Sequence, residues 1–115
     1  MTYTKTGVSA GVTYKLKVQA RNAVGLGAQS SEFSIIAATT PGLPTALIRD
    51  EVNTSKTQAA FTWTVPASNG GSAVIDYIIM WDQGTGTFVQ AATGITTTSY
   101  TKTGLTSGTT YNFKV

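Results

Sequence analysis

Residues 3–18 read YTKTGVSAGVTYKLKV, and residues 100–115 read YTKTGLTSGTTYNFKV. Ten of these sixteen aligned positions are identical, including both glycines and both tyrosines, and the two copies lie 97 residues apart. A separation of that size is the length of one β-sandwich domain, which contains about 100 residues. The repeat therefore predicts that the chain begins partway through one copy of a tandem domain and stops at the equivalent point of the next.

Apolar and polar residues alternate along several short segments, which is typical of half-buried strands, and clusters of Gly, Pro, Asn and Ser separate them. No segment has a helical period. We expect short strands with the following bounds: 14–21, 33–39, 47–52, 59–64, 74–82 and 88–92. Turn signals every 8 to 12 residues predict an all-β sandwich.

The alternation also predicts which side chains face the core. In the first strand Tyr14, Leu16, Val18 and Ala20 are expected to point inward. The other inward positions are Ala59, Phe61 and Trp63, then Tyr77, Ile79 and Trp81. Their neighbours are expected to face solvent, namely Ala60, Thr62 and Thr64, then Asp76, Ile78, Met80 and Asp82.

The composition narrows the classes of partner. Charged residues make up 11% of the chain and hydrophobic residues 41%, while 22 threonines suit the solvent face of strands. The net charge of +3 comes from single, scattered Lys and Arg residues, whereas a binder of nucleic acid or anionic membrane concentrates them in a patch. No apolar stretch reaches the length of about 18 residues that a membrane helix needs. We therefore expect neither a nucleic-acid partner nor direct membrane insertion.

The chain offers no residues for catalysis. Cys and His are both absent, which removes disulfides, thiolate nucleophiles, imidazole bases and Cys/His metal sites. Asp50 and Glu51 are adjacent on a predicted strand and point to opposite faces, so they do not form an acid/base pair. The glycines of Gly84-Thr85-Gly86 precede no helix and do not form a phosphate loop. We predict no enzyme activity and no catalytic, cofactor-binding or metal site.

Several of these residues also resemble a known family. Pro44, Trp63, Pro66 with Asn69-Gly70-Gly71, Tyr77 and residues 104–111 resemble the fibronectin type III domain, an immunoglobulin-like Greek-key β-sandwich. The resemblance implies two partial tandem repeats: residues 1–43 would be strands E, F and G of one copy, and residues 44–115 strands A, B, C, C′, E and F of the next. It also implies that the hydroxyl of Tyr111 bonds to nearby backbone.

One pair of residues departs from the family pattern. Lys5 and Lys102 fall where the family usually places an apolar inward residue on strand E. An unpaired buried ammonium is costly, so we expect each lysine to extend along the core edge to solvent or to find an acidic partner.

Three surface features are candidate sites. Ile78 and Met80 form an apolar pair on the predicted outer face, and we interpret them as a protein contact. Asn53-Thr54-Ser55 is an N-glycosylation sequon, usable at Asn53 if the chain enters a secretory pathway. The basic stripe Lys15, Lys17 and Arg21 is interpreted as solvated surface, which leaves a glycan contact unsupported. The predicted turn after residue 21 lacks the Arg-Gly-Asp tripeptide that integrin-binding relatives of the family use, so integrin recognition has no support.

These observations lead to one principal function and two alternatives. The principal hypothesis is a non-catalytic structural or adhesive module of a tandem-repeat protein, extracellular or at a cell surface, in which repeats stack in series or in a filament. The alternatives are an accessory spacer of a large secreted glycan-active enzyme and an intracellular cytoskeletal or ciliary scaffold.

The division into partial repeats also predicts the partners. With strand G missing from residues 44–115, one edge of strand F is expected to be open, and open edges pair with other chains. The expected partners are therefore other copies of this chain or adjacent repeats.

Overall fold

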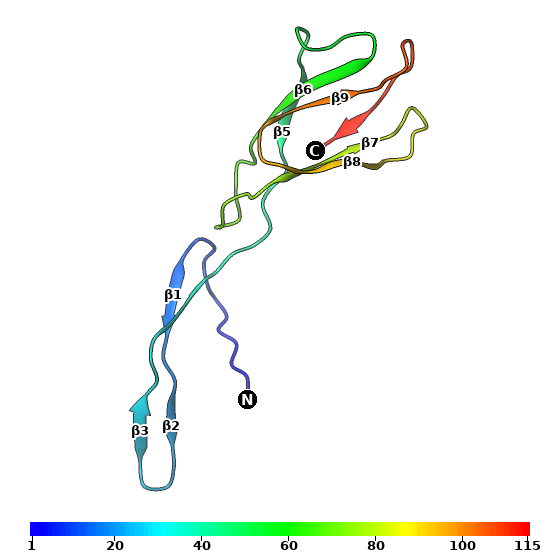
Figure 1. Ribbon diagram of the computed structural model, residues 1–115. Coiled ribbons are helices and arrows are strands. Elements are labelled where there is room, and N and C mark those ends of the chain that lie inside the picture. The colour runs from blue at the N-terminus through cyan, green and yellow to red at the C-terminus, as the bar shows by residue number, and fades with distance from the viewer. The chain divides into compact units, whose positions relative to one another are not determined.

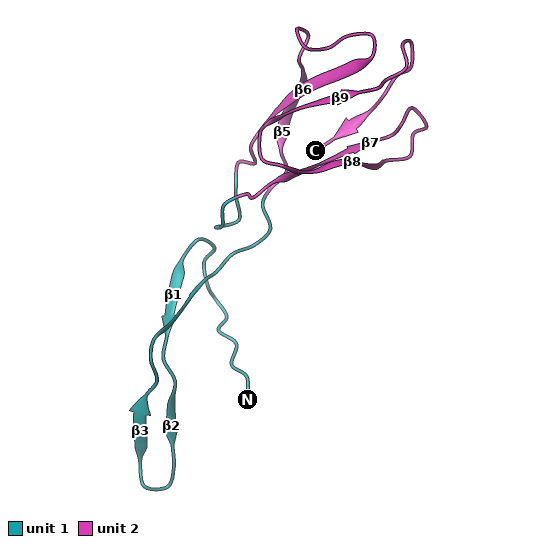
Figure 2. Ribbon diagram, in the orientation of Figure 1, with its two compact units in different colours: residues 1–41, 68–73 teal, residues 42–67, 74–115 magenta.

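The computed structural model describes residues 1–115 as ten strands joined by turns and loops (Figure 1). The chain divides into two compact units (Figure 2): unit 1 contains residues 1–41 and 68–73, and unit 2 contains residues 42–67 and 74–115. Each unit is built differently.

Unit 2 is a sandwich of two antiparallel sheets. One sheet has the order β5-β6-β9 and the other the order β10-β7-β8. Their bounds are β5 Thr45–Arg49, β6 Gln58–Thr64, β7 Tyr77–Trp81, β8 Val89–Ile95, β9 Ser99–Thr103 and β10 Phe113–Lys114. The predicted all-β sandwich is thereby confirmed, and β6 ends just before Pro66, which cannot donate to a ladder.

The core of unit 2 lies between the two sheets. Phe61 and Trp63 from β6 and Tyr77 and Ile79 from β7 are buried, as predicted. Trp63 meets Tyr77 edge-on at 5.3 Å between ring centroids, and the ring of Phe113 lies 4.9 Å from that of Phe61. Pairs of this geometry stabilise a core beyond the area that they bury.

The expected alternation fails at Ala60. This residue was expected to face solvent, but it is only 3% exposed, whereas Ala59 is half-buried. The turn after β5 folds over it: Asp50 N donates to Ala60 O at 2.9 Å, and Ala60 N donates to Thr54 Oγ1 at 3.1 Å. A strand period does not reveal such a cover, because the cover comes from a separate segment.

Unit 1 consists of two strand pairs. β1 (Thr13–Leu16) pairs with β4 (Phe33–Ile36), and β2 (Gln19–Arg21) pairs with β3 (Leu26–Gln29). The predicted inward face of residues 14–20 is not covered. Among residues 1–41 only Tyr14 and Ala37 are half-buried, and Val18 is 73% exposed. The prediction of a core there is wrong because no second sheet packs on this face within unit 1.

The repeated sixteen-residue pattern folds in the same way in both units. Tyr111 Oη accepts a hydrogen bond from Thr106 N at 3.1 Å, and at the equivalent place Tyr14 Oη accepts one from Ser9 N at 2.9 Å. Gly7, Gly11, Gly104 and Gly108 all have φ between 68° and 83°, a conformation that glycine adopts without strain. The predicted tyrosine-to-backbone bond is confirmed.

Candidate functional site

The predicted contact pair lies on the outer face of β7. Ile78 is 47% exposed and Met80 is half-buried. Met80 stands opposite Lys114 of β10, whose ammonium lies 3.9 Å from the centroid of the Phe88 ring. Ile78 is therefore the more accessible member of the pair.

A cation and three aromatic rings occupy the edge of the core. Lys102 is half-buried, and its Nζ lies 4.3 Å from the centroid of the Trp81 ring. Trp81 also stacks on Tyr111 at 5.8 Å and on Phe113 at 6.4 Å between ring centroids. Lys102 thus reaches an indole face in place of an acidic partner. Because the half-buried Trp81 ring already has these neighbours, it is not a free platform for a sugar.

Unit 2 contains a buried carboxylate that the alternation of residues along the strand does not predict. Asp82 was expected on the outer face with Asp76, but it is 2% exposed and follows the end of β7. Its Oδ2 accepts from Asn112 Nδ2 at 2.6 Å, and its Oδ1 accepts from Asn112 N at 3.0 Å and from Gly84 N at 2.9 Å.

These bonds explain the charge state of Asp82. The side-chain bond from Asn112, followed by the backbone bonds from Asn112 and Gly84, holds the pKa of Asp82 below its usual value. The carboxylate joins the end of β7 to the residue before β10 and has a structural role. The only sequence signal for it was the Asp-Gln-Gly order at the end of a strand, which is typical of a tight turn.

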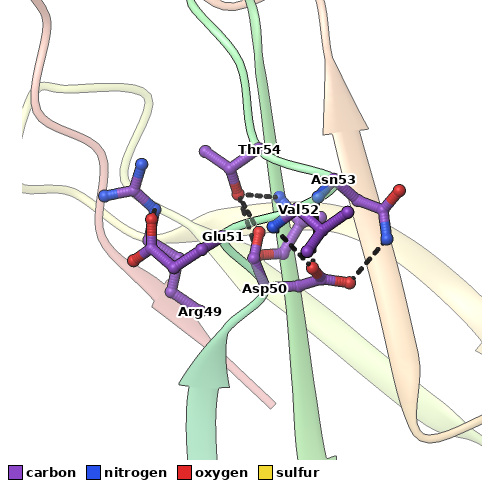
Figure 3. A network of polar contacts seen from close by, with 7 residues as sticks. Arg49, Asp50, Glu51, Val52, Asn53 and Thr54 are labelled. Carbon is purple, nitrogen blue, oxygen red and sulfur yellow. Dashed lines mark hydrogen bonds and ion pairs between the residues drawn. The ribbon is translucent and has the colours of Figure 1, made fainter.

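The sequon lies in a hydrogen-bonded turn between β5 and β6 (Figure 3). Asp50 Oδ1 accepts from Val52 N and Asn53 N, and Asp50 Oδ2 accepts from Asn53 Nδ2 at 2.7 Å. Thr54 Oγ1 donates to Asp50 O at 2.6 Å. The side-chain hydrogen bond from Asn53 is the largest cause of the lowered pKa of Asp50. Asn53 is exposed, and its Nδ2 retains one N–H after glycosylation, so a glycan there is compatible with the bond to Asp50.

The sandwich of unit 2 is open along β10. This strand pairs with β7 on one side and with no strand on the other. Next to it lies a cavity of about 480 Å³, whose lining includes the apolar residues Leu47, Ala59, Ala60, Phe61, Leu105 and Phe113.

The basic stripe does not form a patch. Lys15 Nζ lies 2.8 Å from Glu32 Oε1, so one of its three cations is neutralised across the β1–β4 pair. Nowhere do three or more His, Cys, Asp or Glu side chains come together in a way that could hold a metal ion. The structure also contains no helix with the length and apolar character needed to cross a membrane.

Comparisons with known proteins agree with this architecture. The sequence model of the fibronectin type III domain matches residues 44–115. Exoglucanase B of Cellulomonas fimi is 32% identical over an alignment of 126 positions that includes the whole of this chain. The chain spans only 11% of that enzyme.

Solved structures of similar fold include two fragments of titin and one of the rat CD45 extracellular region. Domains A168–A170 of titin match 93% of this chain, which spans 35% of that fragment, at 25% identity and a TM-score of 0.68. The titin kinase with its flanking domains matches 66% of this chain, which spans 14% of it, at 30% identity and a TM-score of 0.58. Domains d3–d4 of the rat CD45 extracellular region match 98% of this chain, which spans 58% of that fragment, at 16% identity and a TM-score of 0.62, and so share the fold.

Proposed function

Because this chain belongs to the fibronectin type III family, a non-catalytic type of module, we propose that it serves as a spacer repeat, one of several sandwiches joined in series in a larger extracellular protein. The observation that carries the proposal is the corner motif, which recurs after 97 residues with the same glycine conformations and the same tyrosine bond. Repetition at domain length is what a serial array requires. The proposal includes the division of the chain into two partial repeats, residues 1–43 and residues 44–115.

The host that we favour is a secreted glycan-active enzyme. The support is the 32% identity to an exoglucanase, in which the matching segment occupies about a tenth of the protein. A match of that extent is what an accessory domain outside a catalytic domain would give. The similarity to an extracellular fragment of CD45 supports the same compartment.

The spacer role can be tested against glycan binding. The 115-residue chain is incubated with microcrystalline cellulose, pelleted and assayed for bound protein and released sugar. We expect the protein to remain in the supernatant and no sugar to be released, because Lys102, Tyr111 and Phe113 already contact the Trp81 ring and no acid/base pair is formed. Retention on the pellet that a soluble oligosaccharide reverses would contradict the spacer role.

A structural or adhesive role at a cell surface or in a filament is the second candidate. The observation that favours it is the 47% exposure of Ile78 on the outer face of β7. If Ile78 and Met80 mediate adhesion, cells should attach to a surface coated with the chain, and Ile78→Thr should reduce attachment. Equal attachment to the chain and to an albumin coating would count against this candidate.

A further inference from the structure

A turn in unit 1 contains the single Asn-Gly step of the chain. Residues 68–71 read Ser-Asn-Gly-Gly, and this segment belongs to unit 1 (Figure 2). Asn69 is exposed, whereas Gly70 is buried. The backbone nitrogen that follows an asparagine can attack the side-chain amide, and a glycine at that position has no Cβ to hinder the approach. The Asn69-Gly70 step is therefore open to a reaction within the chain itself.

The hydrogen bonds of this turn favour the reaction. Asn69 Oδ1 accepts from Gly71 N at 2.9 Å, which folds the side chain toward the backbone that follows it. A donor at this oxygen stabilises the negative charge that develops there during attack. Gly70 N donates to Ser68 Oγ at 3.2 Å, so the nitrogen that must lose its proton already faces a hydroxyl group.

The other three asparagines each lack one of these features. At Asn53 and Asn112 the side-chain nitrogen, which is the leaving group, is held by a carboxylate at 2.7 Å and 2.6 Å. Asn22 Oδ1 accepts from backbone N–H groups, as Asn69 Oδ1 does, but Ala23 follows it and carries a Cβ. Asn69 combines a polarised carbonyl, a side-chain nitrogen without a hydrogen bond and a glycine neighbour.

We propose that Asn69 is a site of spontaneous deamidation, and that its isoaspartate product releases segment 68–73 from residues 39–40. Gly70 N attacks Asn69 Cγ and closes a succinimide ring. The bond from Cγ to Nδ2 breaks, and ammonia leaves with the proton that Gly70 N gives up. Water then opens the ring: cleavage of the bond between Gly70 N and Cγ gives aspartate, and cleavage of the bond to the main-chain carbonyl carbon gives isoaspartate.

The surroundings of Gly70 explain why the isoaspartate form should lose its contacts within unit 1. Gly70 O accepts from Thr39 N at 2.8 Å, and a Cβ added to Gly70 would collide with Thr39 O. Isoaspartate directs the main chain through Cβ and Cγ, which lengthens it by one atom directly before this close approach. Aspartate leaves the main chain unchanged, and its carboxylate can still accept from Gly71 N. The expected release therefore depends on the backbone and not on the new charge.

The first test is ageing of the full chain at mildly alkaline pH, followed by mass spectrometry of its proteolytic peptides. We expect replacement of the amide by an acid at position 69 before any change at positions 22, 53 and 112, with isoaspartate among the products. Asn69→Gln is the matched control, because glutamine would have to close a larger ring, and its peptide should stay unchanged over the same period. An unmodified Asn69, or earlier loss of the amide at another asparagine, overturns the proposal.

Hydrogen exchange of the Thr39 amide separates the effect of the backbone from that of the charge. The isoaspartate form, isolated by ion exchange, and the variant Asn69→Asp carry the same charge. We expect the Thr39 amide to exchange roughly fivefold or more faster in the isoaspartate form, as for the loss of one backbone hydrogen bond, and at an unchanged rate in Asn69→Asp. Equal rates in all three forms, or equal acceleration in both acidic forms, would overturn the release of segment 68–73.

Discussion

Asp82 shows how one side chain can join distant parts of a sandwich. Its two oxygens accept three hydrogen bonds, one from the turn that follows it and two from Asn112, thirty residues along the chain. A buried carboxylate is tolerated only with such partners, because an unpaired charge in the interior is costly. Its charge therefore belongs to the stability of unit 2.

The stability of the chain should depend on this carboxylate at acid pH. The pKa of Asp82 is lowered in the folded state, so its contribution is fully present above the unfolded pKa near 4 and is lost as pH falls through the lower folded pKa. Asp82→Asn should flatten the acid limb of a profile of unfolding free energy against pH. The control Asp76→Asn removes a charge from an exposed position and should leave that limb in place. Indistinguishable profiles for the chain and Asp82→Asn would contradict the role assigned to Asp82.

Neighbouring isoleucines of β7 should respond very differently to the loss of one methyl group. Ile79 is 0% exposed, and Ile79→Val should lower the unfolding free energy by about 0.5–1.5 kcal/mol, because the surroundings fill the space only partly. Ile78→Val, at a position 47% exposed, should change it by less than about 0.5 kcal/mol. Urea unfolding of both variants measures the difference. Equal losses would mean that the burial of Ile79 is wrong.

At the scale of elements, the connection between β7 and β8 begins with a tight turn, residues 82–85, that carries backbone strain. Gln83 and Gly84 have φ of 55° and 75°, and Thr85 N donates to Asp82 O at 2.8 Å. Two successive residues with positive φ are typical of a turn that favours Asn-Gly at these positions. Glutamine is a poor choice for the first of the two positions.

Replacement of Gln83 should therefore stabilise the chain. Asn adopts the left-handed region more readily than Gln, so Gln83→Asn should raise the unfolding free energy by up to about 1 kcal/mol. Gln90→Asn, within β8, is the matched control and should give no gain, because Asn is disfavoured in strands. Guanidinium unfolding monitored by Trp fluorescence compares the two. A gain for both variants, or for neither, would remove the turn as the cause.

At the scale of the whole molecule, the two units differ in the number of buried side chains that stabilise them. Unit 2 has a core of four buried aromatic or aliphatic side chains, whereas none of residues 1–41 is buried. Local stability follows the number of buried apolar contacts, so a chain of this kind does not open uniformly.

Amide hydrogen exchange should separate the units. The paired amides of β6 and β7 should exchange only through global unfolding, whereas those of β1 to β4 should exchange much faster through local opening. Slow exchange of β1 would show that unit 1 is stabilised by contacts that its exposure does not suggest.

The strand content and the repeat follow from local features of the sequence, and the tyrosine corner follows from the resemblance to the family. Alternation in residues 59–64 and 77–81 is a local signal, as are the glycines at fixed distances from Tyr14 and Tyr111. The predicted strand ends differ from the observed ones. The strand predicted at 47–52 is β5, which ends at Arg49 because Asp50 begins a turn. The strand predicted at 88–92 is β8, which continues to Ile95 because its ladder with β7 extends that far. The protein contact at Ile78 and Met80 and the glycosylation of Asn53 stay predictions.

The segments that cover each strand could not be predicted from local features of the sequence. Ala60 is buried by a turn that begins ten residues earlier, Lys102 lies on an indole from the opposite sheet, and Asp82 is buried against Asn112. The predicted inward face of β1 remained exposed for the same reason. A period along the chain reports which side of a strand is apolar, but burial depends on a second surface, and that surface comes from residues far away in the sequence.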